Sequence, residues 1–236
     1  MSDIMTMIWK ESKDSLFQGG WRSLIRPLFI VGIMGIYLPL QFGPLWVDLT
    51  PLGMILLLWI PFFVIISFIG DAIAGERERH TLETLLASRM SDRAILLGKI
   101  ITTVLYAWGM SILSMLLGLV LVDLVRLQGD WMFYPPDLFL DALVLSLLAS
   151  LLGASAGVLI SLRASTVRQA QQILSIGTIV LVFGTTFVLR ALPANLFSSL
   201  NYQQVLLVAI AVIVVLDAIL LGLSFASFRR SRLILS

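Results

Sequence analysis

The chain has 236 residues, of which 59% are hydrophobic and only 13% are charged, and its mean hydropathy is +1.01. Soluble domains carry about a quarter charged residues, so this composition indicates an integral membrane protein and leaves no room for a sizeable soluble domain. The net charge of +2 comes from basic residues scattered at the ends of apolar runs, which argues against a nucleic-acid partner. With no cysteine in the chain, a disulfide framework, thiol chemistry and a cysteine-based metal site are excluded.

An amphipathic helix is expected at the start of the chain, over residues 2–18. Charged residues interrupt this segment and exclude a cleavable signal peptide. Its apolar side chains share one broad face, which is typical of a helix that lies in the membrane interface. These side chains are Ile4, Met5, Ile8, Trp9, Leu16 and Phe17.

Six apolar runs are long enough to cross the hydrocarbon layer, which takes about 20 residues of helix. The sequence therefore predicts an all-α integral membrane protein in which residues 1–236 form one transmembrane domain. Gly43 and Pro44 favour a tight turn between the first two runs. The predicted spans are residues 27–47, 49–70, 100–122, 142–162, 169–189 and 205–228.

The basic residues set the orientation of these spans. Of the 16 Lys and Arg residues, 14 fall on one side of the predicted topology, and only Arg126 and Arg190 fall on the other. Because basic residues are retained on the cytoplasmic side, both termini and the segment between spans two and three are expected there.

The loop between spans three and four, on the outer side, carries Trp131, Phe133 and Tyr134. Aromatic residues at this depth are typical of the headgroup belt. A substrate-binding loop is the alternative, and the sequence leaves both open.

The segment between spans two and three, residues 71–99, is the only long polar passage in the chain. We expect a short helix over residues 76–88, a turn, and then Ser91 and Asp92 as the cap and first turn of the third span. Leucines at helical spacing and alternating charges favour a docking surface for a protein partner. The alternative is a solvated connecting helix with no partner.

The residues of this segment form a recognisable motif. The run ERERHTLETLLAS at residues 76–88, followed by Ser91-Asp92-Arg93 and then Gly98-Lys99, resembles the cytoplasmic segment of type 2 ABC transporter permeases. The interfacial N-terminal helix, the six spans and the short turn after span four are similar as well. One departure is His80, which stands where glycine is commoner in that family.

The resemblance implies a permease subunit of an ATP-driven exporter in the cell (inner) membrane of a prokaryote. It implies that two permease halves, identical or different, pair with separate ATPase chains that bind ATP and magnesium. No substrate follows from it. The residues it assigns to ATPase coupling are Glu76, Arg77, Glu78, Arg79, His80, Thr81, Leu82, Glu83, Leu85 and Leu86.

No catalytic residue is expected in this chain. Its one Gly-Lys pair, Gly98-Lys99, lacks the first glycine and the Ser or Thr of a nucleotide-binding loop. A membrane scaffold or sensor that recruits a cytoplasmic partner through residues 76–88, without moving a solute, remains the alternative to a permease.

Residues 153–157 match the G-x-S-x-G pattern of hydrolases, but they fall inside a predicted membrane helix rather than at a strand-to-helix turn. An intramembrane serine protease would need a base beside Ser155, and the sole histidine, His80, belongs to the cytoplasmic segment. The small residues Ala149, Gly153 and Gly157 instead predict close packing of this helix against another.

Asp217 is the one charged residue inside the sixth span. Insertion of an aspartate at that depth costs about 2.5 to 3.5 kcal/mol, so its side chain must face protein or water. It is either a polar group or proton site on a translocation path, or a hydrogen-bonding partner of a neighbouring helix. No cluster of carboxylates or histidines predicts a metal site.

Overall fold

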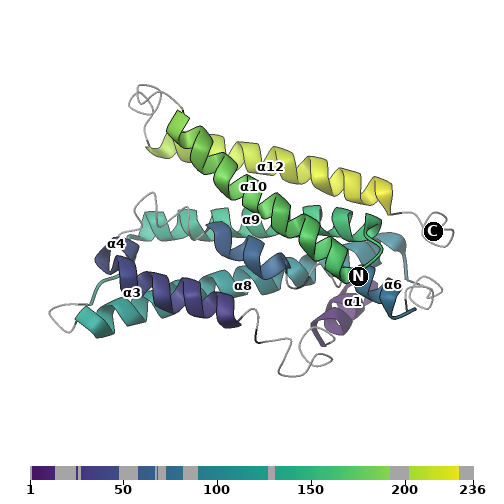
Figure 1. Ribbon diagram of the computed structural model, residues 1–236, viewed down its shortest axis with the longest axis horizontal. Helices are drawn as coiled ribbons and strands as arrows, with labels where there is room; N and C mark the ends of the chain where they lie inside the picture. Colours follow the sequence, from purple (N-terminus) through teal and green to yellow (C-terminus); the bar gives the residue numbers. More distant parts are fainter. Residues whose placement is uncertain are drawn as a thin grey trace.

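The computed structural model describes residues 2–13, 25, 28–47, 58–66, 68, 73–81, 90–126, 131–191 and 202–228. Within those ranges all regular secondary structure is helical, as the composition predicts (Figure 1). Four long helices run roughly along the longest axis of the molecule. They are α8 (Asp92–Arg126), α9 (Pro136–Arg163), α10 (Val167–Ala191) and α12 (Tyr202–Ser227).

Three of these helices are long and apolar enough to cross a membrane, namely Asp92–Val125, Pro136–Arg163 and Gln203–Ser227. They contain the predicted third and fourth spans and all but the last residue of the sixth, and α10 contains the predicted fifth. At 1.5 Å per residue, the 35 residues of α8 extend about 50 Å, whereas the hydrocarbon layer is about 30 Å thick. The ends of α8 therefore project beyond that layer, and its N-terminal end carries the polar residues that precede Ile100.

The first predicted span is interrupted rather than continuous. A π-helical segment, η2 (Ile33–Tyr37), leads into α3 (Leu38–Phe42), and after Gly43, at φ 54°, the chain forms α4 (Pro44–Val47). The N–H of Leu38 bonds to the carbonyl of Ile33, five residues back. Pro39 follows at once and has no N–H to donate, so the ordinary hydrogen-bond ladder is lost at this point.

Of the second predicted span, residues 58–66 are described and form a helix. Trp59, Ile60, Val64 and Ile65 are buried there. Residues 49–57 and most of 67–72 lie outside the described residues.

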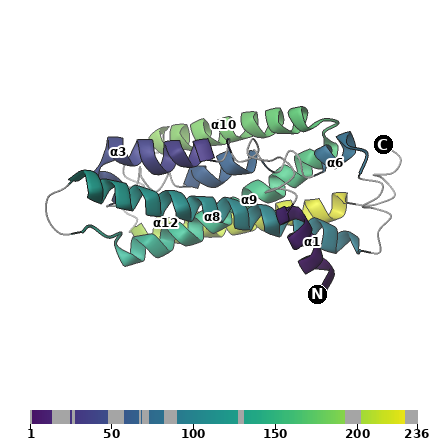
Figure 2. The ribbon, with the colours of Figure 1, turned by 90° about the horizontal axis from the view of Figure 1, so that it is seen from below.

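The core forms around α8 and α9. Small residues let other elements approach α8 closely: a Cβ on Gly35 would lie 3.0 Å from the backbone of Ser114, and one on Gly118 would lie 2.5 Å from the Trp46 indole. On the other side of the molecule, α12 packs against α9 (Figure 2). Large apolar side chains such as Phe183 and Phe187 on α10 and Val208 and Ile219 on α12 remain exposed, as expected for surfaces in contact with lipid or another subunit.

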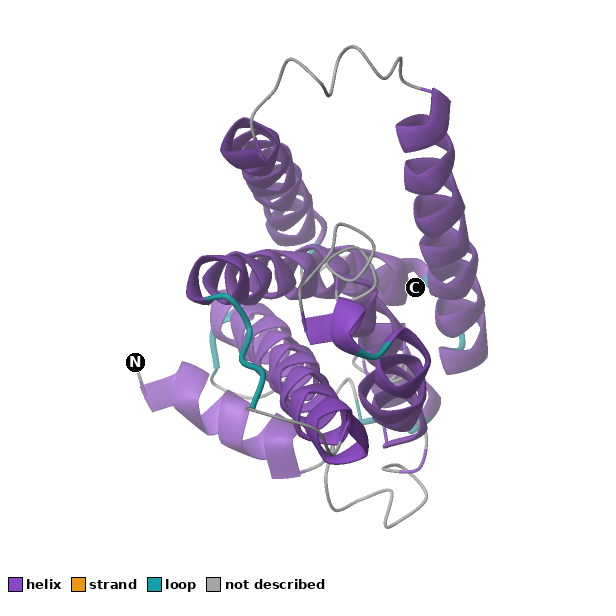
Figure 3. Cartoon of the chain, turned by 90° about the vertical axis from the view of Figure 1, so that its left-hand side faces the viewer, coloured by secondary structure: helices purple, strands orange, loops and turns teal. Residues whose placement is uncertain are grey.

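At one end of the bundle, the short helix α6 (Ala74–Glu78) lies near α1 (Ser2–Lys13), the end of α9 and the start of α10 (Figure 1). Helix α1 runs across the long axis of the bundle rather than along it (Figure 3). Its buried contact is made by Met7, fully enclosed, while Met5 and Trp9 of the predicted apolar face stay 69% and 66% exposed. The amphipathic pattern therefore misses the residue that packs inward. Leu16 and Phe17 lie outside the described residues.

At the opposite end, the aromatic residues before α9 divide into two kinds. Trp131 and Phe133 are exposed, as headgroup-belt residues would be, whereas Tyr134 is buried and donates a hydrogen bond to the carbonyl of Met115 at 2.9 Å. Burial raises the pKa of the Tyr134 hydroxyl above its ordinary value, which keeps it a protonated donor. Pro136 then opens α9 at a position where its missing N–H is not needed.

Candidate functional site

The candidate site is built around α6, the described helix of the polar segment. At five residues, α6 is far shorter than a helix that is stable alone in water. It therefore depends on the contacts that its two ends and its charged side chains make with neighbouring helices.

The N-terminal end of α6 is capped by a side chain from another helix. The hydroxyl oxygen of Ser161, fully buried in α9, accepts hydrogen bonds from the N–H groups of Ile73 at 3.1 Å and Ala74 at 3.0 Å. The first N–H groups of a helix have no partner within it, and Ile73 at the cap position offers no side-chain acceptor. Ser161 supplies that acceptor from 88 residues away in the chain.

The C-terminal end of α6 closes in a Schellman motif. Thr81 donates its N–H to the Glu76 carbonyl at 2.9 Å, and His80 donates its own to the Arg77 carbonyl at 3.1 Å. His80 itself takes a left-handed conformation, φ 55°, which glycine adopts most easily. The helix expected over residues 76–88 therefore does not continue through Arg79–Thr81, and the glycine commoner at this position matches the backbone that the turn requires.

Two charged side chains of α6 cap the helices on either side of the α9–α10 turn. The Arg77 guanidinium donates to the carbonyls of Ala164 at 2.6 Å and Leu162 at 3.2 Å, at the C-terminal end of α9. The Glu78 carboxylate accepts the N–H of Val167 at 2.9 Å, at the N-terminal end of α10. Each charge has the sign that the partial charge of that helix end favours.

Small side chains make this close approach possible. Ala74 of α6 packs with Ala164 and Ala170 from the α9–α10 turn and the start of α10, and all three are buried. Helix α6 and the α9–α10 turn are thus joined by apolar contact as well as by three sets of hydrogen bonds.

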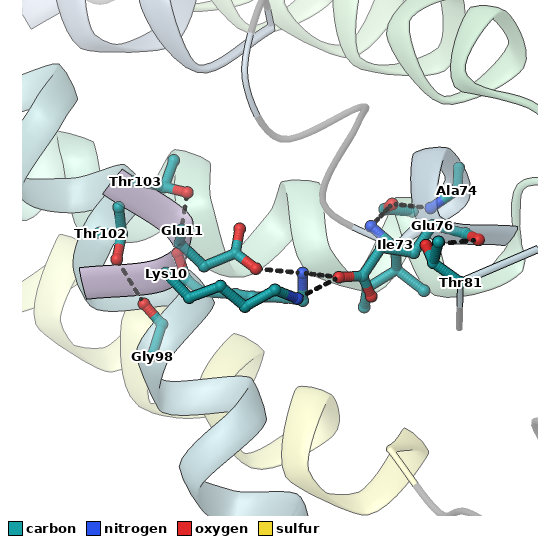
Figure 4. Close-up of polar contacts among 11 residues, drawn as sticks. Lys10, Glu11, Ile73, Ala74, Glu76, Thr81, Gly98, Thr102 and Thr103 are labelled. Atoms are coloured by element: carbon teal, nitrogen blue, oxygen red, sulfur yellow. Dashed lines mark hydrogen bonds and ion pairs between the residues drawn. The ribbon is translucent and has the colours of Figure 1, made fainter. Parts of the chain in front are cut away.

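A buried lysine joins α6 to two more helices. The Lys99 ammonium, with 2% of its side chain exposed, lies 2.8 Å from Glu11 of α1 and 3.1 Å from Glu76 of α6. Lys10 also reaches Glu76, at 3.4 Å. Figure 4 shows Lys10 and Glu11 on one side of this cluster and Glu76 on the other. The two ammonium groups balance the two carboxylates, which buried charges require.

The preceding residue, Gly98, is where α1 crosses α8. A Cβ at this position would lie 2.5 Å from Cγ of Met7, closer than non-bonded atoms approach. The Gly-Lys pair thus has a structural role: the glycine admits α1, and the lysine holds α1 and α6 to the start of α8.

The residues that sequence analysis assigned to coupling therefore divide into three groups. Glu76, Arg77 and Glu78 bind other helices of this chain, whereas Arg79, His80 and Thr81 are exposed. The remaining four, Leu82, Glu83, Leu85 and Leu86, lie outside the described residues.

Sequence reasoning missed the partners Glu11, Lys99 and Ser161. Lys99 carried a usable signal, since a lone charge at the border of a span needs a counter-charge. A single serine in a membrane helix, such as Ser161, carries no such signal.

Asp217 is 3% exposed in α12, and neither carboxylate oxygen has a hydrogen-bond partner among the described residues. Of the predicted small-residue positions, Ala149, Gly153 and Gly157 are all buried. A Cβ on Gly153 would lie 2.7 Å from the side chain of Ile65 in the helix of residues 58–66.

Ser155 lies within α9, with no strand-to-helix turn around it, and its hydroxyl has no partner in the described structure. Ser224 of α12 donates to the Ser155 carbonyl at 3.3 Å. No group of three or more His, Asp or Glu side chains within the described ranges is placed to hold a metal ion.

Comparison with known proteins gives one family. The model of a family described as ABC-2 family transporter protein matches residues 47–235, which include every long helix and the whole of the α6 segment. No protein of curated function matches the sequence. The family is a membrane-transport family whose members associate with ABC ATPases, and the match agrees with both the motif at residues 76–99 and the membrane-length helices. The chain belongs to the ABC-2 family of transporter permeases.

Proposed function

We propose that this chain is the permease subunit of an ATP-driven exporter of the cell (inner) membrane, and that it contains no catalytic residue. ATP and magnesium are bound by a separate ATPase chain, which docks on the cytoplasmic face at residues 76–88. A second permease half, identical or different, completes the membrane unit. Family membership supports the transport role, and the distribution of basic residues supports the cytoplasmic placement of α6.

One observation carries this proposal: α6 is attached to four other helices at once. Glu76 joins it to α1 and α8 through the buried Lys99, Ser161 and Arg77 join it to α9, and Glu78 joins it to α10. A connector that served only to link two spans would not need a fixed place in the fold. A segment that receives force from a partner needs such attachments, because otherwise its displacement would be lost in local motion.

The long helices give that displacement a route through the membrane. Helices α8, α9 and α10 each begin or end beside α6 and then extend through membrane-length segments. Closure of the ATPase subunits would move α6, and these helices would carry the motion toward the opposite face. Asp217, a buried polar group within α12, is the described side chain we place on the translocation path.

Cysteine cross-linking tests this function cleanly, because the chain has no cysteine of its own. The variant Thr81→Cys places a thiol on the exposed turn after α6, and Phe133→Cys places a matched exposed thiol at the opposite end. In membranes that also contain the candidate ATPase, labelled with a thiol-reactive cross-linker, we expect Thr81→Cys to be joined to the ATPase and Phe133→Cys not to be.

A second measurement separates a permease from a recruiting scaffold. With the same ATPase, the wild-type chain should stimulate ATP hydrolysis. Arg77→Gln should still cross-link through Thr81→Cys while stimulating less, because α6 then loses its Arg77 attachment to the end of α9 and keeps only the Ser161 cap and the alanine contacts. A chain that binds the ATPase without changing its turnover would be a scaffold. Labelling of Thr81→Cys by an impermeant reagent from outside the cell would overturn the proposed orientation and the function with it.

A further inference from the structure

A groove lies between the start of α8 and the end of α12. Its volume is about 510 Å³, and it is lined by Asp92, Arg93, Leu96, Leu97, Phe225 and Phe228. This volume is within the range of about 300 to 1,000 Å³ found for small-molecule sites. The residues that line it are charged at one end and apolar along the rest, which is the pattern of a site for an amphiphile.

The charged end of the groove is positive toward a ligand. Arg93 is exposed, and within the described ranges no ion pair engages its guanidinium. Asp92 already interacts within the chain. The N-terminal end of α8 adds a partial positive charge at the same place. An anionic group is therefore favoured at this end.

The apolar part of the groove lies at the boundary between the lipid headgroups and the acyl chains. Leu96 and Leu97 come three to four residues before Ile100, where the predicted span begins, which corresponds to about 5 Å along the helix. Arg93 is about 10 Å from the same point, at the depth of the headgroups. On the facing helix, Phe225 is 36% exposed and Phe228 is nearly buried, and both fall at the end of the predicted sixth span.

We propose that this groove binds one anionic phospholipid of the cytoplasmic leaflet. Its phosphate bonds to the Arg93 guanidinium, and an acyl chain lies along Leu97 and Phe225. A lipid held there would link the beginning of α8, beside the Lys99 network, to the end of α12. This inference concerns lipid binding alone and does not require an ATPase partner.

Native mass spectrometry of the full chain tests it, with phosphatidylglycerol and phosphatidylcholine of identical acyl chains. We expect the wild-type protein to retain one phosphatidylglycerol at least about tenfold more tightly than phosphatidylcholine. Both lipids carry the phosphate, but the choline ammonium of phosphatidylcholine cancels its charge and is repelled by Arg93 and the N-terminal end of α8. Arg93→Gln should abolish that preference. The matched control Arg163→Gln removes another exposed arginine from the same end of the bundle, away from the groove, and should keep it.

Two further measurements identify the ligand. Phe225 is 36% exposed, and Phe225→Ala should weaken binding of both lipids, because it removes an apolar side chain from the groove and no charge. Displacement of phosphatidylglycerol by inorganic phosphate would show a free-anion site and overturn the proposal. Equal retention of both lipids by the full-length protein would also overturn the proposal. That result would follow if the chain's own C-terminal residues filled the groove.

Discussion

Among the described residues, buried charge lies in two regions that are built in opposite ways. Around α6, Lys99 has two carboxylate partners, and Ser161 and Arg77 each bond to two backbone groups. Only Oε2 of Glu76 lacks a partner among the described groups there. Within α12, by contrast, both oxygens of the buried Asp217 have none.

The difference indicates which of the two regions is held in place by contacts within the chain. A buried network with its charges balanced holds its helices in one arrangement. A buried carboxylate without a partner is costly in a membrane and is retained where function needs it. The contacts of the α6 region therefore hold it in one arrangement, whereas no described side chain holds the Asp217 carboxylate.

The largest expected effect comes from breaking the fixed region at Lys99. Lys99→Met leaves Glu11 and Glu76 close together in a buried site without the charge that holds them. Removal of one partner from a buried ion pair costs about 3 to 5 kcal/mol. We therefore expect a large fall in the melting temperature of the detergent-solubilised protein, with loss of protection against proteolysis in α1.

Lys10→Met is the matched control for this variant. Lys10 also lies near Glu76, but its side chain is 40% exposed and the separation is 3.4 Å, so the loss should stay below about 1 kcal/mol. If the two variants were equally stable, the buried network would not be what holds α1 and α6 to α8. A triple variant that adds Glu11→Gln and Glu76→Gln to Lys99→Met should recover part of the loss.

Much of the fold could be predicted from the sequence, because apolar length and the placement of charges are local properties. The predicted third, fourth, fifth and sixth spans fall on the helices α8, α9, α10 and α12, three of which are of membrane length. Ser91 caps α8 as expected, accepting the N–H of Ala94 at 3.2 Å. The interruption of the first span could not be placed, although Pro39 was visible, since a proline in an apolar run can kink, bulge or end a helix.

The candidate site was harder to predict, because its partners are far apart in sequence. Glu76, Arg77 and Glu78 were interpreted as a surface for a second protein, whereas the structure gives each of them a partner within the chain. Alternating charge shows that partners exist, but not whose they are. Ser161, 88 residues from Ile73, could be connected to α6 only through the tertiary structure.

A smaller effect, of opposite sign, is expected in the unpaired region. Asp217→Asn removes a charge that has no hydrogen-bond partner among the described residues, so we expect the free energy of unfolding to rise by about 1 to 3 kcal/mol, measured by thermal unfolding in detergent. Asp123→Asn should lower the free energy of unfolding slightly. Oδ1 of Asp123 accepts the N–H of Met132 at 3.1 Å, and this hydrogen bond weakens when its acceptor is no longer charged. A clear loss of stability in Asp217→Asn would mean that the carboxylate has a stabilising partner, and the contrast between the two regions would fail.

The smallest effect is expected at the end of α6. His80 is exposed and takes a left-handed conformation, φ 55°, which is easier for glycine than for a residue with a Cβ. His80→Gly should therefore stabilise the turn by about 0.5 to 1 kcal/mol. Because such a change is local, it is best measured as several-fold slower hydrogen exchange of the Thr81 amide, which donates to the Glu76 carbonyl. His80→Ala keeps a Cβ and should give no such slowing. Faster exchange in the glycine variant would show that the imidazole itself holds the turn, and that the α6 region depends on a contact beyond the network around Lys99.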